Sequence, residues 1–190
     1  MKRKSQIILA SQSPRRQMLL KRLVAKFQCE AAQVNETASR HLTPNEIAKT
    51  NAHRKALAIA QKHPKALVIG SDTVVALGAK TFAKPQDLQE AARFLKRLSG
   101  KTHQVITGVS LLSLEPLRVK LFSETTHVGF QRLNGQSIRE YLSMINPLDK
   151  AGGYAIQEHG EWIIGEIFGS YTNVVGLPME RLRDELKRWQ

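Results

Sequence analysis

The hydrophobic positions of the chain repeat with two different periods, and each period predicts one kind of element. Leu, Ile, Met and Ala recur at helical spacing in some stretches, whereas other stretches are short apolar runs or alternate with polar residues. The helical pattern covers residues 15–24, 44–63, 86–98 and 134–144, and a further helix closes the chain after Pro178. Strands are expected at residues 6–10, 27–31, 66–69 and 162–167, and residues 102–131 form two long strands around a turn near Glu115 and Pro116.

Residues that start and stop helices lie at the borders of these stretches. Ser13 and Asn134 are good N-caps, and the His63–Pro64 pair and Gly100 are typical of helix ends. Helices alternate with strands in the first half and the long strands pair as a hairpin in the second, so the pattern predicts an α/β fold with a mixed sheet. No repeat, low-complexity tract or linker divides the sequence, and we expect residues 1–190 to form a single domain.

Composition narrows the class of protein. The sequence has 29 Lys and Arg against 16 Asp and Glu, a net charge of +13, and 42% hydrophobic residues, a composition that excludes an intrinsically disordered chain. The single cysteine, Cys29, excludes an intramolecular disulfide and a cysteine-based zinc site, and it indicates a reducing compartment. The positive charge predicts an anionic partner, which is a nucleotide, a nucleic acid or phosphate.

The N-terminal sequence and the hydropathy pattern both favour a cytoplasmic protein. The basic start at Lys2–Lys4 is typical of a signal peptide, but the apolar run that follows, Ile7–Ala10, is too short for an export signal. No stretch reaches the roughly 18 apolar residues that a membrane-spanning helix needs. We therefore expect a cytoplasmic location and no membrane partner.

The segment 11–16 (SQSPRR) joins an expected strand to an expected helix. A helix N-terminus carries free backbone N–H groups and a partial positive charge, and the hydroxyls of Ser11 and Ser13 and the guanidiniums of Arg15 and Arg16 lie beside it. This arrangement predicts an anion site with phosphate as its guest. The alternative is an ordinary N-cap followed by two solvated arginines, and the hexapeptide alone does not decide between them.

Several well-known nucleotide and metal motifs are absent from the sequence. There is no GxxxxGK[ST] loop and the glycines do not fall in GxGxxG, which excludes P-loop NTPases and dinucleotide-binding enzymes. The six histidines are scattered and form no HExxH pair, so a zinc site built from histidines is not expected.

Asp72 is the carboxylate whose position points most clearly to chemistry. It follows a continuous apolar run at the mouth of a sheet, where a carboxylate is costly unless it is hydrogen-bonded, bound to a cation or functional. The alternative is an Asp that caps a turn. Glu36, Lys55, Lys84 and Lys150 look like ordinary surface charges when each is taken singly, although a proline follows Lys84 and fixes the backbone there.

Six segments, taken in order, carry a pattern that extends along almost the whole chain. They are 9–20 (LASQSPRRQMLL), 70–75 (GSDTVV), 83–85 (AKP), 98–108 (LSGKTHQVITG), 147–157 (PLDKAGGYAIQ) and 169–178 (GSYTNVVGLP). Together they resemble the Maf family of nucleoside triphosphate pyrophosphatases. The resemblance implies an elongated mixed sheet flanked by helices, with a cleft between two lobes. It also implies hydrolysis between the α- and β-phosphates of a nucleoside triphosphate, with Mg²⁺ or Mn²⁺ as cofactor, and homodimers are common in such proteins.

The resemblance assigns roles to individual residues. Asp72 aligns with the proton acceptor of the family, and Asp72 and Glu36 align with the groups that hold the cation. The residues that align with the groups around the triphosphate are Ser11, Arg15, Arg16, Lys55 and Lys84. The chemistry agrees, because cationic groups can hold the charge that develops on the leaving pyrophosphate while Asp72, with a metal, orients and deprotonates a water.

Three positions separate the subgroups of the family. Proteins that act on dTTP and UTP carry the first Arg of the signature, Thr after the catalytic Asp and Gln late in the chain, whereas the group that acts on 7-methyl-GTP has Trp, Gln and Glu. This sequence has Arg15, Thr73 and Gln157, so it resembles the pyrimidine type. A Gln amide both donates to and accepts from a uracil or thymine edge, whereas a Glu suits a guanine edge and a methylated purine. Cleavage of 7-methyl-GTP is the alternative.

The sequence departs from the family pattern in two places. Asn35 stands where an Asp commonly precedes the loop Glu, which removes one metal or water ligand beside Glu36. Residues 49–55 are an uncommon version of the helix before the matched lysine, and they leave Arg54 as an alternative to Lys55.

A nucleic-acid-binding or septum-regulating protein is the rival from another class. The net charge of +13 favours nucleic-acid binding, and the resemblance to the family implies a link to the control of septum formation. Such a protein gathers basic residues on one face together with stacking aromatics. Aromatic residues make up 6% of this chain and its arginines are dispersed. Nucleic acid is therefore not the expected partner.

Overall fold

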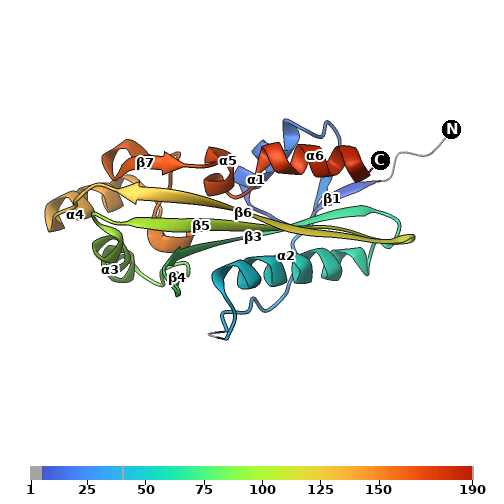
Figure 1. The fold of residues 1–190 in the computed structure, drawn as a ribbon, viewed down its shortest axis with the longest axis horizontal. Helices are drawn as coiled ribbons and strands as arrows, with labels where there is room; N and C mark the ends of the chain where they lie inside the picture. Colours follow the sequence, from blue (N-terminus) through green and yellow to red (C-terminus); the bar gives the residue numbers. More distant parts are fainter. Residues whose placement is uncertain (1–5, 40, 190) are drawn as a thin grey trace.

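A long mixed β-sheet forms the centre of the molecule (Figure 1). The computed structural model describes residues 6–39 and 41–189, so the basic start at Lys2–Lys4 lies outside the described residues. The strands are β1 (Ile7–Leu9), β2 (Gln28–Cys29), β3 (Leu67–Leu77), β4 (Lys80–Phe82), β5 (Thr102–Leu114), β6 (Leu117–Phe130) and β7 (Ile164–Phe168). Their order in the sheet is β2-β1-β3-β5-β6-β7, and β4 pairs with β3. Because β1 runs parallel to β2 and β3 while the other pairs are antiparallel, the predicted mixed α/β sheet is confirmed.

Helices pack against both faces of this sheet. They are α1 (Pro14–Lys21), α2 (Pro44–Ala60), α3 (Leu88–Leu98), α4 (Gly135–Met144), α5 (Tyr171–Val175) and α6 (Met179–Trp189), with 3₁₀ turns at Ala151–Gly153 and Gly160–Trp162. Both α1 and α2 end earlier than the pattern predicts, because the residues that follow them form i→i+3 turns. Among the residues described, no helix is both long and apolar enough to cross a membrane.

The predicted caps hold the helix starts in place. The Ser13 hydroxyl accepts the N–H of Arg16, and the Asn134 side chain accepts the N–H of Ser137. At the start of α2 the side chain and backbone of Thr43 bond reciprocally with Glu46, a full capping box. These caps fix where α1 and α2 begin, and both helix starts border the pocket described below.

Strand β3 is longer than the pattern predicts. The expected end at Ile69 is wrong, because the strand continues through the polar segment 70–73 to Leu77. These polar residues remain in the sheet because residues 68–76 pair with β5, which satisfies their backbone groups. On the other edge, β1 ends opposite Ile69 and the antiparallel β4 ends opposite Val75. Within the described part of the chain, no strand pairs with residues 70–74 on that edge, and this gap makes room for polar side chains.

Helix α2 lies very close to β3 and β5. A Cβ atom on Gly70 would lie 2.2 Å from the carbonyl oxygen of Ala52, and one on Gly108 would lie 2.4 Å from the carbonyl group of Ala48. Glycine in the sheet and alanine on the facing side of the helix permit this approach. The close packing brings the polar side chains of α2 to the level of Asp72.

The hydrophobic core has separate parts toward the two ends of the sheet, as the prediction of two lobes requires. At one end, α3 and α4 pack on β5 and β6 around Val105 and Val128. At the other end, α1 and α6 pack on the face that carries Ile69, and α2 packs on the face that carries Val68. Figure 1 shows these two ends on the left and right of the long sheet.

Candidate active site

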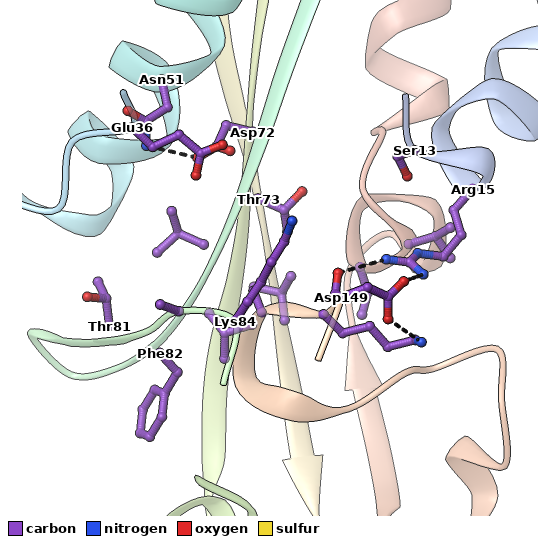
Figure 2. A pocket seen from close by; sticks show the side chains of 18 of the residues that line it. Ser13, Arg15, Glu36, Asn51, Asp72, Thr73, Thr81, Phe82, Lys84 and Asp149 are labelled. Carbon is purple, nitrogen blue, oxygen red and sulfur yellow. Dashed lines mark hydrogen bonds and ion pairs between the residues drawn. The ribbon is translucent and has the colours of Figure 1, made fainter. Parts of the chain in front are cut away.

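A pocket of about 250 Å³ opens beside the middle of β3. One part of its wall comes from the start of α1, the loop 36–38 and α2, and the other part comes from residues 81–84 and 149–157. Figure 2 shows the polar side chains that line it, from the carboxylates of Glu36 and Asp72 on one side to the guanidinium of Arg15 on the other. The carboxylates of Glu36 and Asp72 therefore lie at one side of the pocket, and the guanidinium of Arg15 lies at the other.

Lys55 joins two carboxylates at the first of these sides. Its Nζ atom lies 2.6 Å from Oδ1 of Asp72 and 2.7 Å from Oε1 of Glu36. Asp72 is only 6% exposed, whereas Glu36 lies at the rim of the pocket. Burial by itself opposes ionisation of Glu36, but the bond from Lys55 and the nearby positive charges outweigh it and hold the pKa of Glu36 below its usual value. Glu36 is therefore an anion at neutral pH.

These two carboxylates also fit a divalent cation. Oxygen atoms of Asp72 and Glu36 converge on one ammonium nitrogen, so the structure already gathers them around a point of positive charge. Among the described residues, no three His, Cys, Asp or Glu side chains gather closely enough to hold a metal ion by themselves. Mg²⁺ is often held by one or two carboxylates and completes its coordination with water and substrate phosphates. The donor set thus suits a metal that is shared with a nucleotide.

The two arginines at the start of α1 are fixed by protein groups. The guanidinium of Arg16 donates to the carbonyl oxygen of Gly176 and to Oγ1 of Thr73, each at 3.0 Å. Arg15 donates to the carboxylate of Asp149 at 2.9 Å. Burial lowers the pKa of Arg16 below its ordinary value, against the opposing effect of the two carboxylates, and the guanidinium stays charged at neutral pH. The alternative of two solvated arginines does not describe this segment.

The other residues aligned with the triphosphate differ in their access to the pocket. Lys84 is an exposed side chain of the pocket wall, and its charge contributes to the low pKa of Glu36. Ser13 also lines the pocket. Ser11 is buried outside the lining, where its Oγ accepts the N–H of Ser13. The fold therefore brings Lys55, Lys84 and both arginines to the pocket and leaves Ser11 behind the start of α1.

The three positions aligned with nucleotide preference all line the same pocket. Oγ1 of Thr73 lies 3.0 Å from the guanidinium of Arg16 and 3.0 Å from Oγ1 of Thr107. Arg15 points toward Asp149 (Figure 2), and Gln157 is an exposed residue of the segment 149–157. Gln157 is thus an accessible side chain of the pocket, while Thr73 helps to fix an arginine.

A buried network anchors the segment that carries Gln157. The hydroxyl of Tyr141 donates to the carbonyl oxygen of Ala155 at 3.1 Å and accepts the N–H of Ala155 at 3.0 Å. The neighbouring Tyr154 hydroxyl lies 2.7 Å from Nε2 of His103 on β5. Two buried tyrosines therefore hold the backbone just before Gln157, so the position of its Cα atom is well fixed.

Two polar residues of the pocket are not singled out by the sequence. Asn51 is 2% exposed and donates to Oδ2 of Asp72 at 3.2 Å. Asp149 bonds Lys150 as well as Arg15; burial opposes its ionisation, but these two bonds outweigh it and hold the pKa of Asp149 below its usual value. A signal for Asn51 exists, because it is a polar residue one helical turn before Lys55 on an alanine-rich face. For Asp149 the signal is its place beside Lys150 in a family segment.

The two departures from the family pattern contact each other. Nη1 of Arg54 donates to the backbone carbonyl oxygen of Asn35 at 3.1 Å. Lys55, rather than Arg54, contacts both carboxylates. Arg54 therefore holds the loop beside Glu36 from outside the pocket lining.

Comparison with known sequences finds close similarity along the chain. The sequence profile of the family described as Maf-like protein matches residues 6–189. A dTTP/UTP pyrophosphatase of Carboxydothermus hydrogenoformans is 44% identical over 183 residues, which are 96% of this chain and 98% of that protein. A dTTP/UTP pyrophosphatase of Bacillus pumilus is 45% identical over 177 residues, which are 93% of each chain.

Comparison with solved structures supports the fold. The Ham1 protein of Staphylococcus aureus superposes with a TM-score of 0.58, covering 98% of this chain and all of that one. Its sequence identity is 16%, so this likeness concerns the fold alone. The extent of the profile match and the identity to full-length relatives establish the family, and the chain belongs to the Maf family of proteins.

Proposed function

We propose that this protein hydrolyses the bond between the α- and β-phosphates of dTTP and UTP, giving the monophosphate and pyrophosphate. The observation that carries the proposal is the pairing of Glu36 and Asp72 on Lys55, across one pocket from Arg15 and Arg16. The names of the relatives support the same reaction and the same substrates. The proposal extends to modified pyrimidine nucleoside triphosphates, which carry the same phosphate chain and a related base.

The cationic side of the pocket binds the phosphates. Arg16 is already fixed by Gly176 and Thr73, so its charge is set in place before the nucleotide arrives. Arg15 is held by Asp149, and Lys84 is an exposed cation of the same wall. Cations that are oriented in advance stabilise the charge that develops on pyrophosphate as the anhydride bond breaks.

The carboxylates of the pocket orient and deprotonate the water that attacks the α-phosphorus. Asp72 accepts a proton as the water oxygen bonds to the α-phosphorus and pyrophosphate departs as the leaving group. Glu36 and Asp72 are the residues that would hold Mg²⁺ or Mn²⁺. Such a cation neutralises phosphate charge and makes water easier to deprotonate, which suits Asp72 because an ordinary Asp is a weak base.

Nucleotide preference is assigned to Arg15, Thr73 and Gln157. The anchored segment 149–157 presents Gln157 at the pocket, where its amide can both donate to and accept from the edge of uracil or thymine. Thr73 acts through the Arg16 guanidinium that it contacts.

The direct test is pyrophosphate release by the purified protein from dTTP, UTP, CTP, ATP, GTP and 7-methyl-GTP, with Mg²⁺ or Mn²⁺ and with a chelator. We expect cleavage led by dTTP and UTP that the chelator abolishes. A lead for 7-methyl-GTP would overturn the assignment of Gln157 and keep the reaction. No turnover of any nucleotide, together with salt-sensitive binding of nucleic acid, would favour the rival binding protein.

The cellular setting and the assembly follow as further proposals. A nucleoside triphosphate substrate and the single cysteine, Cys29, favour a cytoplasmic protein. We also propose that residues 1–190 act as one domain and that the protein assembles as a homodimer, which sedimentation of the purified protein tests.

A further inference from the structure

Asn51 uses its whole side-chain amide to connect two parts of the pocket. Its Oδ1 atom accepts the N–H of Thr37 at 2.8 Å, and its Nδ2 atom donates to the carbonyl oxygen of Thr37 at 3.1 Å and to Oδ2 of Asp72 at 3.2 Å. The residue is 2% exposed, so water does not compete for these bonds. A neutral amide is the group that can satisfy all three partners, because it both donates and accepts.

Asn51 and Lys55 lie one turn apart on α2 and divide the Asp72 carboxylate between them. Lys55 takes Oδ1 and Asn51 takes Oδ2. Each of them also reaches the loop 36–37, since Lys55 bonds the side chain of Glu36 and Asn51 bonds the backbone of Thr37. Helix α2 thus carries two parallel links between the loop and the strand.

The bonds of Lys55 and those of Asn51 differ in whether they can persist when a divalent cation binds. The ammonium of Lys55 is the positive charge between the carboxylates, so a divalent cation competes with it for the same oxygen atoms. The side chain of Asn51 contacts Oδ2 of Asp72, which Lys55 does not use. It contacts the loop at the backbone of Thr37. The Asn51 link therefore leaves an oxygen of Asp72 and the whole Glu36 carboxylate free for a metal.

We propose that Asn51 is a positioning residue that fixes Glu36 relative to Asp72, and so prepares the two carboxylates to share one divalent cation. This inference rests on the proposed function, because it concerns the metal of that reaction. Ligands held in advance bind a metal more tightly than ligands on a free loop, and loss of such supporting groups typically weakens metal affinity roughly 10- to 100-fold. The side chain of Asn51 acts through its bonds to Thr37 and Asp72.

The test is the Asn51→Leu substitution, which keeps the size of the side chain and removes every polar contact. The probe is Mn²⁺ binding, followed by electron paramagnetic resonance, to the full-length protein with the non-hydrolysable α,β-imido analogue of dUTP. We expect the half-saturating Mn²⁺ concentration to rise roughly 10-fold or more. Hydrogen exchange at the Thr37 amide should become faster, since its acceptor is lost. An unchanged half-saturating concentration would overturn the proposal.

The control is Asn45→Leu on the same helix. Asn45 donates to Oγ of Ser123 at 2.8 Å, outside the pocket lining, so its loss should leave Mn²⁺ binding unchanged. If Asn51→Leu does not fold, Asn51→Ser replaces it, because a hydroxyl is too short to reach both the loop and Asp72.

A double-mutant cycle with Glu36→Gln separates positioning from general damage. Where Asn51 acts through Glu36, Asn51→Leu weakens Mn²⁺ binding in the wild-type background and has little effect in the Glu36→Gln background. Equal effects in both backgrounds would contradict the proposal. Failure of the proposed function is seen separately, as a wild-type protein that releases no pyrophosphate.

Discussion

The Nζ atom of Lys55 lies 2.6 Å from Oδ1 of Asp72, and the two side chains are only 12% and 9% exposed. Lys55 belongs to α2 and Asp72 to β3, and the pair forms because glycines in the sheet let the helix approach. An ion pair at this depth is costly to break, since the remaining partner is left with an uncompensated charge. The pair therefore holds the Asp72 carboxylate in one orientation at the pocket.

Asp72→Asn should remove the proposed proton acceptor while keeping the shape of the side chain. We expect the rate of pyrophosphate release from dTTP to fall by about 10²- to 10⁴-fold, the contribution typical of a general base. The matched control is Asp184→Asn, which removes an exposed carboxylate on α6 and should leave the rate unchanged. A rate close to that of the wild-type protein in Asp72→Asn would show that Asp72 is not the base.

Gln157→Glu should change which nucleotide the protein prefers. A carboxylate cannot donate to a uracil or thymine oxygen, so we expect kcat/KM for UTP to fall by roughly 10-fold or more relative to that for 7-methyl-GTP. The measurement is kcat/KM for both nucleotides in the wild-type and variant proteins. An unchanged ratio would remove Gln157 from the specificity residues.

Gly108→Ala should destabilise the protein because the new Cβ atom would lie 2.4 Å from the carbonyl group of Ala48. Backbone cannot yield as a flexible side chain does, and overpacking of this kind costs about 3 kcal/mol of the free energy of unfolding. The control is Gly135→Ala at the start of α4, where the nearest atom is the flexible end of Arg139 at 3.5 Å. Urea unfolding compares the two, and equal stability of both variants would contradict the close approach of α2.

His103 should make the protein less stable in mild acid. Burial among Phe130 and Tyr154 lowers the pKa of His103 to about 4, whereas an unfolded His has a pKa of about 6.5. Between these values the unfolded chain binds a proton that the folded protein does not. The contribution of neutral His103 to stability is therefore fully present above about pH 6.5. As the pH falls from there toward 4, the free energy of unfolding decreases by on the order of 2–3 kcal/mol.

The variant that checks this is His103→Gln, which keeps a polar group and does not titrate. Its free energy of unfolding should depend less steeply on pH between 4 and 6.5 than that of the wild-type protein. The exposed His41→Gln variant should keep the wild-type slope. Parallel pH curves for the wild-type and His103→Gln proteins would rule out His103 as the titrating group.

The sequence by itself determined five of the six described helices, the hairpin and the mixed sheet, but neither β4 nor α5. These follow from local rules, since a cap such as Ser13 or Asn134 acts within one turn and periodicity reports which face of an element is apolar. It also named the pocket residues Lys55, Lys84 and both arginines, but neither Asn51 nor Asp149. It also marked Asp72, because a carboxylate beside a continuous apolar run needs a partner wherever the chain folds.

Only the tertiary structure decided which groups meet. Strand β3 continues through Asp72 because β5 pairs with it, a contact that no local pattern of polar residues encodes. Arg15 bonds Asp149, which lies 134 residues away in the sequence, and Asn51 bonds a loop and a strand at once. Such contacts depend on distances between elements that packing fixes after each element has formed, and the spacing of residues along the chain does not contain them.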